Sequence, residues 1–253
     1  MELGQPPVHG KRIAFFGGSF DPPHLGHLAV ARAARTALAL DTVILAPVGA
    51  QPLKPQGSTA SFGDRLAMTR LAIGTEPGFA VSLADSPKPA GMPNFTLETL
   101  QALRAQLPSD GALFCLMGAD SFFGLRQWHR SAEIPFVATL IVASRPGQRP
   151  EQWIAGLRTA LPPGLEIESA SGEEIPHSDI EVRSFTLRNA AGDAAPLYLL
   201  PGLHVEISAS QIREQVRDQS RERVEPAASA QAADRPLLPE AVFEYIHAHG
   251  LYQ

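Results

Sequence analysis

The sequence predicts an α/β fold, specifically a Rossmann-like, doubly wound and mostly parallel sheet with a small C-terminal helical portion. Three observations support this prediction. Short apolar runs rich in β-branched and aromatic residues alternate with longer segments of helical periodicity. The first apolar run ends at a glycine turn, Gly17-Gly18, that leads directly toward a helix. The length of 253 residues is enough for one large α/β domain with a ligand cleft.

The elements follow one another regularly as far as Pro146. The first apolar run begins at Arg12, and the second is β-branched and closed by Pro47. Ser61 and Asp64 form an acidic variant of the helix-capping pair. Strands are expected over residues 12–16, 42–46, 79–83, 113–117 and 137–142, and helices over 28–40, 61–73 and 96–107. This alternation predicts a parallel sheet with helices on both faces.

The alternation weakens after Pro146. A helix is expected over 151–161, whereas 166–192 is expected to be irregular with one or two strands. An apolar run at 197–200 precedes two further helices, over 208–217 and over 239–249, and Gly250 ends the second. Residues 219–235 have little to bury and are expected to form a mobile loop. We therefore expect a flexible tail over 1–10, one α/β domain over 11–206 and a helical portion over 207–253 continuous with it.

Charge and cysteine content exclude several classes of protein. The chain carries 21 Lys and Arg against 26 Asp and Glu, a net charge of −5, which disfavours a nucleic-acid-coating protein. The single cysteine, Cys115, excludes a disulfide framework and a four-cysteine zinc site, and its apolar run predicts a buried, inert thiol. The sequence has no cationic, apolar leader and no window apolar enough to span a bilayer. We expect a soluble cytoplasmic protein without nucleic-acid or membrane partners.

Residues 17–27 read Gly-Gly-Ser-Phe-Asp-Pro-Pro-His-Leu-Gly-His and form the strongest motif of the chain. They match neither the dinucleotide fingerprint nor the P-loop, and a hydrolase elbow would need glycine where Asp21 stands. Gly17 and Gly18 allow close approach of a ligand. The first turn of the following helix offers N–H groups and the positive end of the dipole. His24 and His27 share one face of that turn, so both can reach one phosphate.

The histidines of the chain also have a purely structural interpretation. A single histidine is most often a hydrogen-bonded structural residue, and we interpret the other six in this way. Zinc would need an i, i+4 pair and a third ligand, which this stretch lacks. Two histidines beside a double-glycine turn and a helix start therefore favour a phosphate site.

A second helix start lies at residues 207–214, Ile-Ser-Ala-Ser-Gln-Ile-Arg-Glu. Ser208 and Gln211 have the spacing of a capping box. Ser210 presents a hydroxyl in the first turn, and Arg213 adds a permanent positive charge one turn later. The segment predicts either a second phosphate-binding helix start or an ordinary well-capped helix.

The first of these motifs resembles the G-x-F-D-P-x-H-x-G-H signature of the nucleotidyltransferase superfamily, and the second its I-S-[ST]-x-x-[IV]-R element. Other segments resemble the bacterial nicotinate-nucleotide adenylyltransferase family, in order from about Arg12 to Tyr252. They are residues 94–100, 118–121 with Trp128, 144–147, and 237–252.

This resemblance implies adenylyl transfer from ATP to nicotinate mononucleotide in NAD biosynthesis, with Mg²⁺ bound to ATP and no metal-ligating residues of the protein. No protein nucleophile is required. The implied catalytic residues are His24, His27 and Arg213. The implied ATP- and phosphate-binding residues are Gly17, Gly18, Ser19, Phe20, Lys54, Gly118, Asp120, Ser208 and Ser210, and those beside the acceptor pyridine are Phe95, Thr96 and Trp128.

One loop departs from the family pattern. After the second strand the family commonly carries Pro-His-Lys or Pro-His-Arg, and here Leu53 replaces the histidine before Lys54. Two alternatives remain open, a sister transferase with another phosphate acceptor such as phosphopantetheine, and a non-catalytic nucleotide sensor. Core packing is the alternative role for Phe95 and Trp128. The sequence leaves the oligomeric state and the choice between acid and amide acceptor open.

Overall fold

A computed structural model describes residues 10–144, 156–169, 180–201, 208–222 and 237–253, and within these ranges the strands form one eight-stranded sheet. Its order is β3-β2-β1-β4-β5-β8-β7-β6. The strands are β1 (Arg12–Gly18), β2 (Thr42–Pro47), β3 (Phe79–Val81), β4 (Ala112–Gly118), β5 (Thr139–Ala143), β6 (Leu165–Ser169), β7 (Arg183–Asn189) and β8 (Ala194–Leu200). Neighbouring strands from β3 to β8 pair in parallel, whereas β7 runs antiparallel to both β8 and β6.

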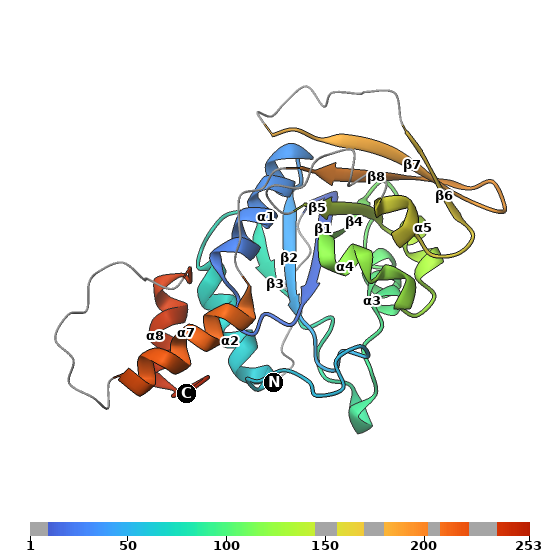
Figure 1. The fold of residues 1–253 in the computed structure, drawn as a ribbon. Coiled ribbons are helices and arrows are strands. Elements are labelled where there is room, and N and C mark those ends of the chain that lie inside the picture. Colours follow the sequence, from blue (N-terminus) through green and yellow to red (C-terminus); the bar gives the residue numbers. More distant parts are fainter. Residues whose placement is uncertain (1–9, 145–155, 170–179, 202–207, 223–236) are drawn as a thin grey trace.

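Helices cover both faces of the sheet, as the sequence predicts (Figure 1). They are α1 (Leu25–Ala37), α2 (Phe62–Ile73), α3 (Thr96–Arg104), α4 (Ala119–Phe123), α5 (Ile134–Val137), α7 (Ala209–Glu222) and α8 (Glu240–Ala248), with short 3-10 turns at Pro89–Gly91, Leu125–Gln127 and Ser131–Glu133. The side chains of β1 alternate between the faces. Ile13 and Phe15 pack in the cluster that contains α3, α4 and α5, and Ala14 and Phe16 pack in the cluster that contains α1.

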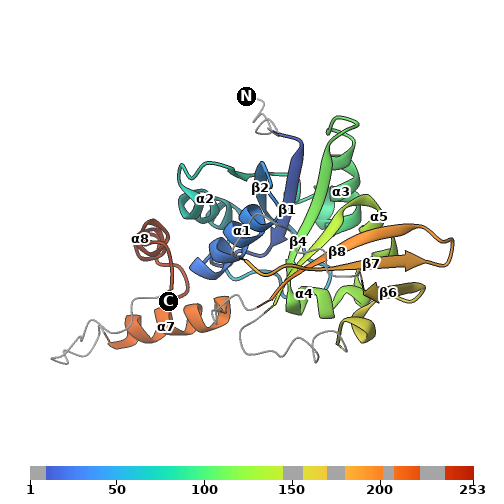
Figure 2. The ribbon, with the colours of Figure 1, turned by 90° about the horizontal axis from the view of Figure 1, so that it is seen from above.

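A third apolar cluster joins α2 to the two C-terminal helices. Met68 and Ala72 of α2 pack in it with Ile212 and Val216 of α7 and with Val242 of α8. The helices α7 and α8 therefore lie beside α2, at the opposite end of the molecule from β6 and β7 (Figures 1 and 2). Within the described residues, no helix has the length and apolar character needed to cross a membrane.

Cys115 lies in the middle of β4 and is buried on the sheet face that α3 covers. Burial raises the pKa of its thiol to about 12. The expectation of a buried thiol is therefore confirmed.

Several expected boundaries were wrong. Helix α1 begins at Leu25 and ends at Ala37, three residues earlier at each end than expected, because the histidine motif already contains its first turn. Val137 ends the short helix α5 instead of starting a strand, since Pro135 is favourable in a first helical turn. By contrast, the one or two strands expected within residues 166–192 are present as the antiparallel pair β6 and β7, and residues 170–179 between them lie outside the described residues.

The expectations for the less regular segments had mixed outcomes. Residues 219–222 extend α7 and do not begin a mobile loop, because no proline or glycine interrupts the helix before that point. The rest of the expected loop, 223–235, lies outside the described residues, as do residues 1–9 of the tail expected over 1–10. Residues 156–160 are helical, and the first part of that expected helix, 151–155, is also outside the described residues.

The order of the first five strands defines where a ligand is expected. The sheet reverses its winding between β1 and β4, and the crevice outside the carboxyl ends of the strands at such a switch point is the usual ligand site of open α/β sheets. The strands β1 and β4 end there in Gly18 and Gly118.

Candidate active site

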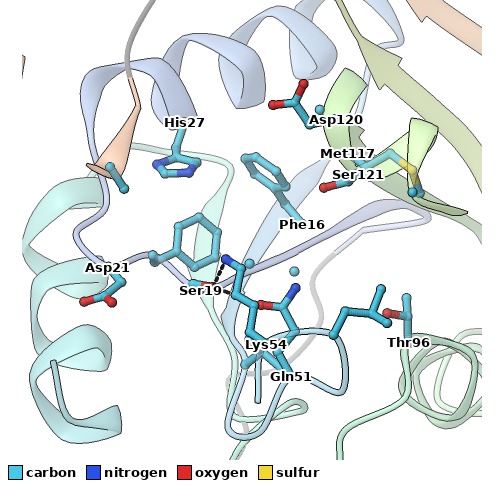
Figure 3. Close-up of a pocket in the computed structure, with 18 of the residues that line it drawn as sticks. Phe16, Ser19, Asp21, His27, Gln51, Lys54, Thr96, Met117, Asp120 and Ser121 are labelled. Carbon is cyan, nitrogen blue, oxygen red and sulfur yellow. Dashed lines mark hydrogen bonds between the residues drawn. The ribbon is translucent and has the colours of Figure 1, made fainter. Parts of the chain in front are cut away.

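A pocket of about 980 Å³ opens at this switch point. It is lined by the ends of β1 and β4, by the loops that follow β1, β2 and β3, and by the first turn of α7 (Figure 3). The structure brings all the residues of the predicted site to this one pocket. They are Gly17, Gly18, Ser19, Phe20, His24, His27, Lys54, Phe95, Thr96, Gly118, Asp120, Trp128, Ser208, Ser210 and Arg213. Their individual roles stay predictions.

The loop after β1 has an unusual backbone. Phe20 is buried and has a φ of 46°, a left-handed conformation that non-glycine residues seldom adopt. Its ring contacts Phe16 and His27 edge-on, with centroid distances of 5.6 and 4.9 Å. A Cβ on Gly17 would lie 2.8 Å from the Phe15 ring. Gly17 is therefore required by packing inside the protein, in addition to any close approach of a ligand.

His24 and His27 occupy the first turn of α1, and their rings stack with centroids 3.7 Å apart. The backbone N–H of His24 donates to Nδ1 of His27 at 3.2 Å. Because that nitrogen accepts, the proton of a neutral His27 ring is on Nε2, which is then a hydrogen-bond donor. Nδ1 of His24 is buried without a hydrogen-bond partner.

Both rings are held in the neutral form. Burial lowers the pKa of His24 to about 4. Burial, together with the neighbouring His24, lowers the pKa of His27 well below its usual value. The pair can therefore offer directed N–H groups to a phosphate at neutral pH, but not two positive charges.

The backbone N–H groups at the start of α1 are less free than the sequence suggests. Besides the N–H of His24, the N–H of Leu25 donates to the carbonyl of Leu237 at 2.9 Å, and that of His27 to the carbonyl of His24. A phosphate bound at this predicted site would therefore depend more on side chains than on the helix terminus.

The first turn of α7 has the predicted capping box. The N–H of Ser208 donates to Oε1 of Gln211, and the N–H of Gln211 donates to Oγ of Ser208, both at 3.2 Å. Arg213 donates from Nη2 to Oγ of Ser210 at 3.2 Å and from Nη1 to the backbone carbonyl of Asp21 at 2.7 Å. The second bond joins the two predicted phosphate motifs directly, across 192 residues of sequence.

The loop after β2 adds the cationic side chain of Lys54. Its Nζ donates to Oγ of Ser19 at 3.1 Å, and Ser19 donates in turn to Oε1 of Gln51 at 3.1 Å (Figure 3). Leu53, where the family commonly has histidine, is 46% exposed. Lys54 thus approaches the β1 loop although its neighbour differs from the family pattern.

The predicted acceptor residues lie at the other end of the pocket. Phe95 occupies the N-cap position of α3, and Thr96 is the first residue of this helix. Both side chains are half-buried. The Phe95 ring lies against His129, with centroids 4.3 Å apart. Trp128 is half-buried, and one side of it packs against the core, so core packing accounts for part of its surroundings but leaves it accessible from the pocket.

Asp120 and two other carboxylates line the pocket. Asp120 is exposed in the first turn of α4. Asp21 and Asp85 are buried, and burial raises the pKa of Asp85 while a hydrogen bond from Thr99 opposes the shift. Among the described residues, no group of three or more histidines, cysteines, aspartates or glutamates is placed to hold a metal ion.

Sequence reasoning missed the role of Arg65. This residue is 2% exposed, and its guanidinium donates to the carbonyls of Ser19 at 2.6 Å, Val48 at 2.8 Å and Ala60 at 3.3 Å. It therefore holds the loops after β1 and β2 together beneath the pocket. A signal was available, because Arg65 shares the buried face of α2 with Met68 and Ala72, where a cation without partners would be costly.

Comparisons with known proteins agree with this geometry. The family described as cytidylyltransferase-like matches residues 15–215. A protein from Gloeobacter violaceus, named probable nicotinate-nucleotide adenylyltransferase, is 35% identical over 245 residues, which cover 96% of this chain and 97% of the relative. A protein of the same name from Sodalis glossinidius is 33% identical over 247 residues, covering 95% and 96% of the two chains.

The fold is also that of a solved structure. The nicotinic acid mononucleotide adenylyltransferase of Plasmodium falciparum, complexed with NaAD, superposes with a TM-score of 0.60 at 14% identity, over 96% of this chain and 98% of that one. At this level of identity the likeness concerns the arrangement of strands and helices.

Proposed function

The chain belongs to the cytidylyltransferase-like family and, within it, to the nicotinate-nucleotide adenylyltransferases, and on this premise we propose that its pocket transfers the adenylyl group of ATP to nicotinate mononucleotide. The products are nicotinate adenine dinucleotide and pyrophosphate. The observation that carries the proposal is the meeting of both nucleotidyltransferase motifs and the acceptor residues in one pocket at the switch point of the sheet.

The reaction needs no nucleophile from the protein. A phosphate oxygen of nicotinate mononucleotide forms a bond to the α-phosphorus of ATP, and the bond from that phosphorus to the bridging oxygen of the β-phosphate breaks in line with it. The electron pair leaves with pyrophosphate. Catalysis then consists of alignment and of stabilising negative charge on the phosphates.

The two helix starts suit these tasks. Neutral His24 and His27 supply directed N–H groups without repelling each other, and the stacking of their rings keeps them on one phosphate-sized area. Arg213 and Lys54 supply positive charge from two other directions. Ser19, Ser208 and Ser210 add hydroxyl groups at the pocket wall. Together these groups can hold the triphosphate and the leaving pyrophosphate.

The acceptor base is assigned to the surface between Phe95 and Trp128. An aromatic side chain against a flat, electron-poor pyridine ring gains stacking energy, and the first turn of α3 at Thr96 presents backbone N–H groups suited to a carboxylate. Asp120, in the first turn of α4 just after β4, is the residue that we propose contacts the ribose or adenine of ATP.

We propose Mg²⁺ as an ion that ATP carries into the pocket, where it neutralises the phosphates. The donor set favours this arrangement. Both oxygens of Asp21 already accept hydrogen bonds, from two backbone N–H groups and a hydroxyl, and the buried Asp85 accepts the hydroxyl of Thr99 at Oδ1, so the hydrogen bonds of these two carboxylates go to the protein itself.

The decisive experiment measures pyrophosphate release from Mg·ATP with nicotinate mononucleotide, nicotinamide mononucleotide and phosphopantetheine in parallel. Release that is fastest with a pyridine mononucleotide supports the proposal, and the ratio between the acid and the amide defines the preference. Release only with phosphopantetheine would indicate the sister transferase. Absence of release with all three acceptors, combined with ATP binding, would indicate a nucleotide sensor.

A further inference from the structure

We propose that Asp21 and Tyr252 are positioning residues of the adenylyl-transfer site, through which the end of the chain holds the β1 loop and Arg213 in their reactive arrangement. The inference rests on the proposed function, since it concerns residues assigned to that reaction. Neither residue is assigned contact with substrate here. Both act through the groups they fix.

Asp21 is the point where three separate segments meet. Its side chain is 5% exposed and accepts the N–H of Thr59 at 2.6 Å, the N–H of Ala60 at 3.1 Å and the hydroxyl of Tyr252 at 2.7 Å. The first two bonds join the β1 loop to the loop after β2. The third joins it to a residue 231 positions later, which is itself 6% exposed. The contacts to Ala60 and Tyr252 are buried, and the contact to Thr59 is partly buried, so water competes little with the first two.

The backbone of the same residue orients the catalytic arginine. The carbonyl of Asp21 accepts Nη1 of Arg213, so any rotation of this peptide moves the guanidinium. On the other side of the strained residue Phe20, the carbonyl of Ser19 accepts Nη1 of Arg65 at 2.6 Å. A left-handed non-glycine residue persists only when its surroundings fix it, and here both neighbours of Phe20 are held by buried polar contacts.

The charges beneath the β1 loop also favour a positioning role for Asp21. Arg65 is buried, and its hydrogen bonds go to three carbonyls, which satisfy its N–H groups but do not neutralise it. Burial lowers the pKa of Arg65, whereas the negative charge of Asp21 acts in the opposite direction. Burial and the same carboxylate raise the pKa of Tyr252, so its hydroxyl remains a donor. Asp21 is thus the counter-charge beneath the loop.

The test compares two tyrosines of the same C-terminal cluster. Tyr252→Phe removes the hydroxyl that contacts Asp21 and keeps the ring. Tyr245→Phe is the matched control, because its hydroxyl donates to a different carboxylate, Oδ1 of Asp64 on α2, at 3.0 Å. Both variants lose one hydroxyl–carboxylate bond, but only the first loses a contact to the β1 loop.

We expect Tyr252→Phe to lower kcat for adenylyl transfer about tenfold, with the KM for nicotinate mononucleotide unchanged, because small displacements of aligned groups slow the chemical step. Tyr245→Phe should keep kcat within twofold of the unmodified protein. A Tyr252→Phe variant with normal kcat, or equal losses in both variants, would overturn the inference.

A double-mutant cycle tests whether Tyr252 affects kcat through Asp21. Asp21→Asn places an NH2 group opposite the N–H of Thr59 or of Ala60, whichever way the amide is turned, and should lower kcat more than Tyr252→Phe does. If Tyr252 acts through Asp21, adding Tyr252→Phe to Asp21→Asn changes kcat less than twofold further. Multiplicative losses in the double variant would contradict this path.

A readout that needs no activity separates this inference from the proposed function. The imidazole ¹⁵N signals of His24 and His27 should shift in Tyr252→Phe and stay constant in Tyr245→Phe. If the unmodified protein fails to release pyrophosphate, the proposed function fails, and these signals still decide whether Tyr252 positions the loop. Unchanged histidine signals in both variants would show that it does not.

Discussion

Helices α1 and α7 both begin at the pocket, and they prepare their first turns in opposite ways. At α1 the groups that we propose to contact phosphate are two stacked histidines with depressed pKa values, and neighbouring backbone N–H groups donate to acceptors within the protein. At α7 a serine–glutamine box caps the helix, and a half-buried arginine one turn later carries a permanent charge.

We interpret this difference as two separate contributions to phosphate binding, in which α1 supplies directed hydrogen-bond donors and α7 supplies positive charge. A neutral imidazole carries no net charge and so attracts phosphate weakly, but its N–H has a fixed direction. A guanidinium is charged and attracts phosphate at longer range. The hydrogen bond from Arg213 to the carbonyl of Asp21 fixes the position of one helix start relative to the other. Substitutions at the start of α1 and at the start of α7 should therefore change the kinetic constants of the reaction to different extents.

The largest effect is expected at α1. His24→Ala should lower kcat by about two to three orders of magnitude, the usual size for loss of one transition-state donor. The ATP dissociation constant, measured by calorimetry, should change much less, because Arg213 and Lys54 still attract the triphosphate. Near-normal turnover would exclude His24 from the reaction.

The buried histidines should also make stability depend on pH. Above pH 6.5 His24 is neutral in both the folded and the unfolded chain. As the pH falls from 6.5 toward 4, the unfolded chain takes up a proton that the folded chain excludes, so the free energy of unfolding decreases, by on the order of 3 kcal/mol in total. Urea unfolding at pH 7 and pH 5 measures this slope. The slope should be shallower in His24→Ala, and equal slopes would contradict a depressed pKa.

At α7, Arg213→Lys keeps the charge and loses the planar fork that contacts Asp21 and Ser210 together. We expect kcat to fall about ten- to a hundredfold, the range for hydrogen bonds of a charged group. Arg217→Lys, one turn further along α7 at an exposed position, is the control and should have no effect. Equal activity of both variants would mean that charge alone suffices at Arg213.

A substitution at the acceptor end should leave both helix starts intact. Trp128→Ala should raise the KM for nicotinate mononucleotide about tenfold through lost stacking, with little change in the KM for ATP. Steady-state kinetics with each substrate varied in turn measures both values. An equal loss for the two substrates would assign Trp128 to core packing instead.

The smallest effect is expected from the cap itself. Ser208→Ala removes the bond to the N–H of Gln211 and should lower the free energy of unfolding by about 1 kcal/mol. The KM for ATP should rise about threefold, the size of one neutral hydrogen bond. Urea unfolding and ATP titration kinetics measure the two changes, and a hundredfold loss of turnover would show that the α7 start depends on more than charge.

Sequence reasoning succeeded where the interacting residues are close along the chain. Ser208 and Gln211 form both bonds of the predicted box, and Ser61 accepts the N–H of Asp64 as a cap should, because a helix start fixes the distance between its cap and its third residue. The parallel part of the sheet and its crevice also follow from the alternation of strands and helices.

It failed where tertiary packing brings together residues that are far apart in the sequence. The hydroxyl of Tyr252 donates to Asp21 across 231 residues of sequence, and the carbonyl of Leu237 accepts the N–H of Leu25. No local spacing of residues indicates either contact. The same limit applies to the antiparallel strands β6 and β7. The strand β6 is at the edge of the sheet, and in β7 the buried Phe185 and Leu187 alternate with less buried residues, so the continuous apolar runs that reveal β1 and β4 are missing from both sequences.

The thiol in the middle of β4 makes the chain convenient for spectroscopy. Cys115 is the single cysteine of the sequence, is 2% exposed and has a pKa near 12, so maleimide dyes, which react with thiolates, will leave it unmodified at neutral pH. A cysteine introduced at an exposed position such as Leu53 can then be labelled alone, without first removing a native residue. Fluorophores placed in this way can report the approach of ATP and acceptor in real time.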